Sequence, residues 1–206
     1  VDRRQRQMCI RDRSNVTDIG KRAFAGCISL QSIGNLPKVT TIGEWTFAGC
    51  AALKSVGNMP NVTSLAHGAF AGYTLYDDDG QKIRTDYCTS LQSIGNMPKL
   101  TTIGDSAFSR CSSLTSVGDL GNVTNIGSYA FGDCIVLKSI GNLPKVTSIG
   151  EYAFAGCAAL KSVGNMPNLT SIGERAFADY SLYDDDGQLI RTDYCTSLQG
   201  LSLIHI

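Results

Sequence analysis

The sequence predicts a repeat solenoid, in which near-identical rungs stack on one another through short parallel β-strands. Seven phenylalanines recur at steps of 23 residues, except for one step of 38 residues that equals 23 plus a 15-residue insertion. The same frame of apolar and polar residues surrounds each of them, as in residues 146–168. A period in this range is typical of units that bury their apolar side only against neighbouring copies. The phenylalanines are Phe24, Phe47, Phe70, Phe108, Phe131, Phe154 and Phe177.

Each rung divides into four predicted segments. The stretch L-x-S-[IV] is extended and pairs in parallel with the next copy, and a proline that follows it in five rungs ends the ladder. The later I-G step predicts a corner that needs either a positive φ or a close backbone approach, although Ala66 interrupts this glycine column. The segment A-F-x-x-C predicts a short helical or 3₁₀ turn with its alanine, phenylalanine and cysteine facing inward.

Two 15-residue insertions, 73–87 and 180–194, interrupt the repeat at equivalent places, 107 residues apart. The segment T-L-Y-D-D-D-G-Q-K-I-R-T-D-Y in the first insertion predicts two extended stretches around an Asp-Gly turn, which is a β-hairpin. Its three consecutive aspartates do not alternate as they do in a calcium-binding loop. A divalent-ion site is therefore the less favoured alternative.

Cysteines and histidines give no pattern typical of catalysis. One column holds seven of the eight cysteines, without the paired spacing of zinc ligands, so buried reduced thiols are expected. His67 falls in a polar surface column, and the glycines follow the repeat and do not form a phosphate-binding loop. We therefore expect no enzyme activity, no cofactor and no metal. The column cysteines are Cys27, Cys50, Cys88, Cys111, Cys134, Cys157 and Cys195.

Charge and hydropathy narrow the possible partners. Eighteen basic and eighteen acidic residues give zero net charge, which argues against nucleic acid, and no apolar run is long enough for membrane insertion.

Two surfaces carry the tyrosine, tryptophan and arginine that are enriched at protein interfaces. One is a variable column, two residues before each phenylalanine, and the other is the pair of hairpins. The alternative for the variable column is a set of surface positions that tolerate any residue, and the alternative for the hairpins is a pair of insertions without function. The variable column is Arg22, Trp45, Gly68, Ser106, Tyr129, Tyr152 and Arg175, of which Trp45, Tyr129 and Tyr152 are candidate contacts. The hairpin candidates are Tyr73, Tyr76, Arg84, Tyr87, Tyr180, Tyr183, Arg191 and Tyr194.

The recurring motif I-G-x-x-A-F-x-x-C-x-x-L, from about Val16 to Leu198, resembles the BspA-type leucine-rich-repeat family. The resemblance implies a right-handed, curved leucine-rich-repeat stack, found in secreted or surface-attached microbial proteins that bind other proteins. We therefore expect an extracellular or cell-surface protein-binding or adhesion module, whose partner is another protein or a glycan. The alternative is a passive structural spacer that holds another domain away from the cell surface. The segment G-N-[LM]-P-[KN]-V departs from the family's usual I-P-x-S-V and leaves the strand register open.

The two ends of the chain do not continue the repeat. Residues 1–14 and 201–206 resemble translated sequencing-adaptor sequence and are interpreted as non-native tails. The solenoid is then expected over 15–200, with seven rungs, as a fragment of a longer chain.

Overall fold

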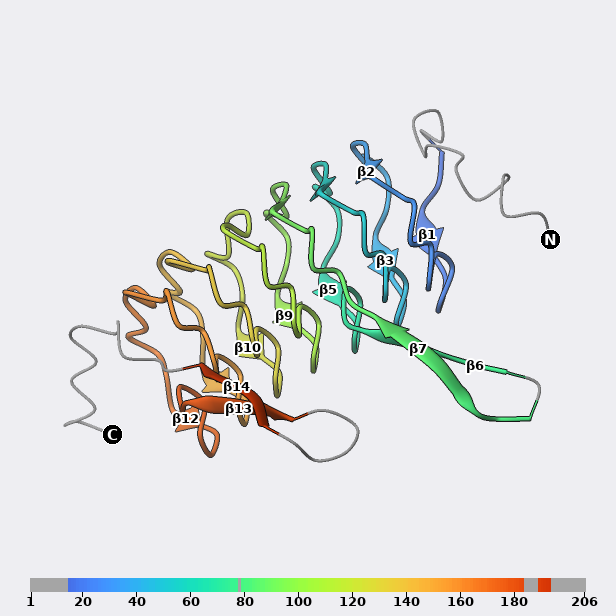
Figure 1. Cartoon of the computed structure of the whole chain (residues 1–206). Helices are drawn as coiled ribbons and strands as arrows, with labels where there is room; N and C mark the ends of the chain where they lie inside the picture. Colours follow the sequence, from blue (N-terminus) through green and yellow to red (C-terminus); the bar gives the residue numbers. More distant parts are fainter. Residues whose placement is uncertain (1–14, 78, 184–188, 194–206) are drawn as a thin grey trace.

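The structure is a computed structural model that describes residues 15–77, 79–183 and 189–193. The rungs stack side by side along one axis, and two hairpins leave the stack (Figure 1). A parallel sheet of two-residue strands runs the length of the stack, in the order β1-β3-β5-β9-β10-β11-β12. These strands are β1 (Asp18–Ile19), β3 (Thr41–Ile42), β5 (Ser64–Leu65), β9 (Thr102–Ile103), β10 (Asn125–Ile126), β11 (Ser148–Ile149) and β12 (Ser171–Ile172).

A second parallel sheet holds the L-x-S-[IV] stretch, which the sequence predicted to be extended. It contains β2 (Ser32–Ile33), β4 (Ser55–Val56) and β8 (Ser93–Ile94), with single bridges continuing it in later rungs. The predicted ladder is therefore confirmed, but the longer ladder lies in the stretch V-T-x-I, which sequence reasoning treated as part of a corner. Its β-branched residues favour extended structure. Threonine hydroxyls reinforce the V-T-x-I ladder. In five rungs the hydroxyl donates to the threonine carbonyl one rung back, as from Thr124 to Thr101 at 3.1 Å.

The glycines of the I-G step allow two rungs to approach closely. A Cβ added to Gly43 would lie 2.6 Å from the backbone nitrogen of Lys21, and one added to Gly150 would be equally crowded by Ser128. None of the glycines of this step has a positive φ among the described residues. Of the two explanations offered for this column, close approach therefore holds, and Ala66 likewise has no positive φ.

The predicted helical turns are wrong, because the A-F-x-x-C segment forms successive hydrogen-bonded turns and no helix occurs among the described residues. Residues with left-handed φ interrupt any helical run in this segment, as at Trp45 (φ 56) and Gly49 (φ 68). The amide of Phe47 then donates to the carbonyl of Ala69 in the next rung, at 2.8 Å, instead of bonding within its own segment. The turn side of the stack is thus held by bonds between rungs.

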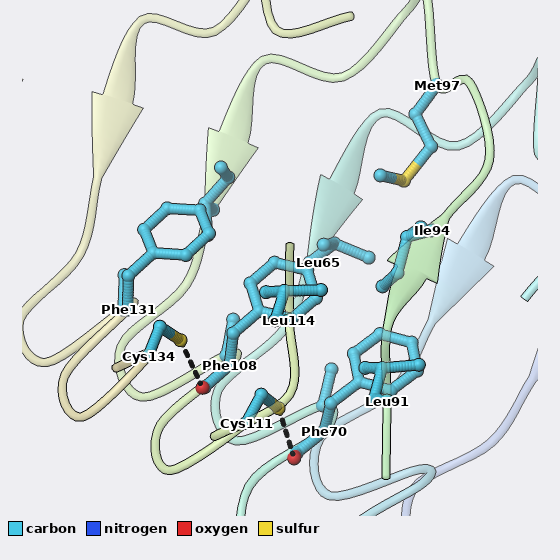
Figure 2. Close-up of a cluster of buried hydrophobic side chains, with 14 of the residues drawn as sticks. Leu65, Phe70, Leu91, Ile94, Met97, Phe108, Cys111, Leu114, Phe131 and Cys134 are labelled. Carbon is cyan, nitrogen blue, oxygen red and sulfur yellow. Dashed lines mark hydrogen bonds between the residues drawn. The ribbon is translucent and has the colours of Figure 1, made fainter. Parts of the chain in front are cut away.

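The core consists of columns of apolar side chains, and the phenylalanine and cysteine columns are uniform among the described residues. The seven phenylalanine rings stack at centroid separations of 5.2 to 5.4 Å, within 17° of parallel. The six described cysteines are buried and reduced, as the sequence predicted. Figure 2 shows the thiols of Cys111 and Cys134 each donating to the carbonyl oxygen of the phenylalanine one rung back. The inward direction of the alanine, phenylalanine and cysteine is confirmed.

Both insertions form antiparallel hairpins, as predicted. The first joins β6 (Tyr73–Tyr76) to β7 (Lys82–Asp86), and the second joins β13 (Tyr180–Tyr183) to β14 (Leu189–Asp193). Their registers are equivalent, and each shifts before the last pair, between Leu75 and Tyr76 in the first and between Leu182 and Tyr183 in the second. The two hairpins are thus copies of one element.

Candidate interaction surface

The variable column has one backbone conformation in every rung. All seven residues have a φ between 52° and 61°, in the left-handed region, although only Gly68 is a glycine. A left-handed conformation costs about 1 to 2 kcal/mol for a residue with a Cβ atom. Cross-rung hydrogen bonds hold the column there, as when the amides of Ser106 and Tyr129 donate to carbonyls of the next rung at 2.7 and 2.8 Å. The column therefore keeps large side chains where glycine would be the least strained residue.

Trp45 lies across the next rung. A Cβ added to Gly68 would stand 2.6 Å from the indole ring, so only glycine in that rung leaves room for it. His67 contacts the same ring edge-on, with ring centroids 4.7 Å apart. Trp45 is half-buried and His67 is exposed, so part of the indole faces solvent.

Tyr129 and Tyr152 are brought together, as expected for adjacent rungs. Their rings stack at 4.8 Å, within 12° of parallel. Arg175 extends the row by one rung: its guanidinium lies 5.7 Å from the centre of the Tyr152 ring and donates to the Tyr152 hydroxyl at 2.6 Å. That hydrogen bond raises the pKa of Arg175. The result is a half-exposed row of two rings and one cation.

The first hairpin is seated on the solenoid by Tyr73. A Cβ added to Gly49 would lie 2.6 Å from the Tyr73 side chain, and one added to Gly26 would lie 3.2 Å from its ring. Both glycines also have a positive φ. Tyr73, proposed from the sequence as a contact residue, is therefore partly buried at the hairpin base, where glycines of two earlier rungs make room for it.

Tyr87 anchors the second strand of the hairpin, where the chain returns to the solenoid. The Arg110 guanidinium lies 4.8 Å from the centre of the Tyr87 ring and donates to its hydroxyl. Asp133, which is 1% exposed, lies 3.7 Å from the same guanidinium. Gly72 leaves room for the tyrosine ring. Sequence reasoning missed Arg110 and Asp133; the available signal was that they replace the glycine found at the equivalent position, 49, of an earlier rung.

The outer part of the first hairpin is exposed. Tyr76 and Ile83 are 57% and 55% exposed, and Arg84 bonds Asp86 at 2.7 Å in an exposed pair. In the second hairpin, Tyr180, Tyr183 and Arg191 fall on strands in equivalent register. Tyr194, residues 1–14 and residues 201–206 lie outside the described residues.

The thiols of the cysteine column have raised pKa values and low reactivity. Burial raises the pKa of Cys88 to about 12 and raises the pKa of Cys111 and Cys134 well above the ordinary value. A thiolate is the reactive form of cysteine, so these thiols are unreactive near neutral pH. Within the described ranges, no group of three or more metal-binding side chains and no helix fit to cross a membrane is found.

Comparison with known proteins places the chain in a family. The BspA type leucine rich repeat region matches residues 9–78 and 85–184 in six copies. The chain therefore belongs to the BspA-type leucine-rich-repeat family. No curated protein sequence matches it significantly.

Solved structures share the fold. A leucine-rich-repeat protein of T. pallidum is 32% identical, with a TM-score of 0.67, and the match covers 79% of this chain and 69% of that protein. A leucine-rich-repeat protein of Bacteroides ovatus is 26% identical, with a TM-score of 0.52, over 79% of this chain and 44% of that one. The chain thus spans less than half of the Bacteroides protein.

Proposed function

We propose that this chain is a protein-binding or adhesion module, without enzyme activity, of a secreted or cell-surface microbial protein. Its partner is another protein or a glycan. The observation that carries the proposal is the first hairpin, which is fitted to the solenoid at its base and exposes apolar side chains beyond it. Membership of a repeat family whose members are generally surface or interaction modules supports the extracellular or cell-surface location.

The solenoid has no packing need for the hairpin. Plain rungs pass from the phenylalanine to the cysteine without it, and ordering fifteen more residues costs conformational entropy. Over residues 15–77 and 79–179, three large apolar side chains are exposed, and two of them, Tyr76 and Ile83, are on this hairpin. Exposed aromatic and apolar groups on a rigid element are typical of contact surfaces.

Two hairpins allow contact at two points. Both leave the stack after equivalent rungs, four Phe-to-Phe steps of 5.2 to 5.3 Å apart, and Figure 1 shows them on the same flank. A partner that engages both hairpins gains affinity because the second contact is intramolecular.

The test is to excise both insertions, joining Gly72 to Cys88 and Asp179 to Cys195, and to confirm folding by circular dichroism. Proteins and glycans retained by the intact chain are then compared with those retained by the double deletion. We expect the deletion to lose specific partners. A matched variant, Tyr76→Ser with Ile83→Ser, keeps the base of the first hairpin and should weaken the same binding.

Two outcomes would contradict the proposed role of the hairpins. If the intact chain retains no specific partner, or if the folded double deletion binds as the intact chain does, the hairpins are not the contact element. Absence of any specific partner would favour the passive spacer.

A further inference from the structure

One column of the proline corner alternates between asparagine and lysine from rung to rung. The alternation adds a period of two rungs to the repeat of 23 residues. Successive lysines are therefore two rungs apart, and an asparagine lies between them. We call this column the lysine–asparagine ladder, and its members are Asn15, Lys38, Asn61, Lys99, Asn122, Lys145 and Asn168.

Hydrogen bonds between rungs hold the ladder in place. The ammonium groups of Lys38, Lys99 and Lys145 donate to the carboxamide oxygen of the asparagine one rung back, at 2.6 to 2.8 Å. Three of the asparagines in turn donate to the proline carbonyl one rung back, at 2.7 to 2.8 Å. The three lysines are exposed, and each ammonium has three N–H donors. Because their positions are fixed, these cations lose less side-chain entropy on binding than unrestrained lysines do.

Positive charge gathers on this side of a chain whose net charge is zero. In each rung, one segment runs from the L-x-S-[IV] stretch through the proline corner to the V-T-x-I stretch. Six of these segments together hold six lysines, one aspartate and no arginine, histidine or glutamate. None of the six lysines forms an ion pair with a described residue. We call this surface the basic flank, and it favours an anionic partner. Its segments are 30–42, 53–65, 91–103, 114–126, 137–149 and 160–172.

The spacing of the ladder lysines sets a condition on that partner. Two rungs, at 5.2 to 5.4 Å per Phe-to-Phe step, separate successive lysines by about 10 Å. An extended polysaccharide advances by about one rung for each sugar ring, so a chain with an acid group on every second sugar matches the ladder. The carboxamide of Asn61 and the exposed hydroxyl of Thr63 are examples of the neutral polar groups between the lysines. Such groups can bond sugar hydroxyls.

Other anionic polymers match the basic flank less well. Double-stranded nucleic acid carries one negative charge per about 1.7 Å of its axis, which is much denser than this row of cations. The six segments contain no arginine and no aromatic residue, which are the types enriched at protein–protein contacts. An acidic polysaccharide is therefore favoured over an acidic protein.

We propose that the lysine–asparagine ladder binds an extended acidic polysaccharide with a carboxylate on every second sugar. Lys38, Lys99 and Lys145 each contact one carboxylate. This inference rests on the proposed function, because it takes a glycan as the partner. It deepens that function by naming the class of glycan and a surface separate from the hairpins.

The experiment uses the full chain and a fluorescein-labelled octasaccharide of hyaluronan, which carries a carboxylate on every second sugar. A chitin octasaccharide is the uncharged control, and an octapeptide of glutamate is the acidic peptide control. Fluorescence anisotropy at low salt gives each dissociation constant. We expect hyaluronan to bind about tenfold more tightly than either control, a ratio that corresponds to about 1.4 kcal/mol. Added salt should weaken this binding, because the contacts are exposed ion pairs.

A triple variant of the ladder locates the site. Lys38→Gln with Lys99→Gln and Lys145→Gln should weaken hyaluronan binding about tenfold, which is the combined effect expected of three exposed ion pairs. The three side chains are exposed, so the variant should fold, and circular dichroism checks this.

A matched triple variant makes the same change of net charge elsewhere on the basic flank. Lys54→Gln with Lys138→Gln and Lys161→Gln removes its other three lysines, which are also exposed. Their ammonium groups make no hydrogen bond to the described residues. This variant should weaken hyaluronan binding by no more than about threefold, because only the general attraction is reduced.

Two further variants test the spacing and the charge separately. Lys99→Asn with Asn122→Lys keeps three lysines in the ladder but spaces them by three rungs and one rung, and it should weaken binding severalfold. Asp119→Asn removes the one acid of the basic flank and restores the residue found at the equivalent position, 96, of the previous rung. It should tighten binding severalfold.

Absence of hyaluronan binding, equal binding of either control, or equal losses in the two triple variants would overturn the inference. Tighter binding of the glutamate peptide would assign the basic flank to an acidic protein and overturn it too. The double deletion of the hairpins leaves the ladder intact, so it should bind hyaluronan as the intact chain does. Hairpin-dependent binding without hyaluronan binding would contradict this inference alone. Hyaluronan binding by a chain whose hairpins bind nothing would contradict only the proposed role of the hairpins.

Discussion

Two columns of the same turn, only two residues apart in each rung, differ in how far their side chains vary. The inner column is phenylalanine in all seven rungs, with rings stacked within 17° of parallel. The variable column holds arginine, tryptophan, glycine, serine and tyrosine on an equally uniform backbone. Close packing explains the first, because any change of volume in the stack leaves a cavity or a clash.

Stability does not explain the second column. Its left-handed φ favours glycine in every rung, yet only Gly68 is glycine, and there the glycine makes room for Trp45. Strained residues that persist on a surface are typical of functional sites. The comparison therefore separates a column that holds the stack together from one that we propose is available for recognition.

The largest expected effect comes from removing one ring of the inner column. Phe131→Ala should lower the free energy of unfolding by about 4 kcal/mol, because a buried ring stacked on both faces is lost. Tyr129→Ala, in the same rung, should cost only about 1 kcal/mol, the value of one stacked pair. Urea unfolding followed by circular dichroism measures both, and equal losses would erase the distinction between the columns.

The clamp of the first hairpin should show the next largest effect. Arg110→Ala removes the cation beside the buried Asp133 carboxylate and should destabilise the protein by about 3 kcal/mol. Adding Asp133→Gly, which restores the residue found at position 156 of a later rung, should recover much of that loss. An unstable double variant would show that the arginine acts mainly through packing on Tyr87.

The cysteine column should make stability depend on alkaline pH. Burial raises the pKa of Cys88 to about 12, so the folded state keeps its proton while the unfolded state loses it near pH 8.5 to 9. Stability is thus fully present below that pH and falls as the pH rises toward 12, by about 1.4 kcal/mol per unit for each such thiol. Urea midpoints between pH 7 and 10 test this, and Cys88→Ala should reduce the slope. A midpoint that does not change across this range would contradict the burial of the thiols.

The smallest effect has the opposite sign. Ser106→Gly should stabilise the protein by about 1 kcal/mol, because glycine adopts the left-handed φ without strain. Thermal unfolding of this variant beside Ser106→Ala measures the relief. A loss of stability in Ser106→Gly would mean that the serine side chain contributes more than its backbone strain costs.

The rung count, the inward columns and both hairpins were predictable because each depends on a period visible in one sequence. The longer sheet at V-T-x-I was not recognised, since two-residue strands carry too little alternation to stand out from a corner. The turn segment has the spacing of a helix, but the left-handed residues redirect its amides to the next rung. The left-handed conformation is set by contacts between rungs and not by the local sequence.

The sequence predicted which residues belong to the candidate site better than it predicted what each of them contacts. The exposure expected of Tyr76 and the pairing of Tyr129 with Tyr152 are found. The seating of Tyr73 on Gly26 and Gly49 depends on two glycines that are distant in sequence, and that fit required the structure. The contact role of these residues stays a prediction.

One measurement tests the separation of the two columns most directly. A variant with glycine in place of Trp45, Ser106, Tyr129 and Tyr152 should fold, with a thermal midpoint close to that of the parent, because relief of backbone strain offsets the lost contacts. A variant that cannot fold, or one whose thermal midpoint falls far below that of the parent, would contradict the account.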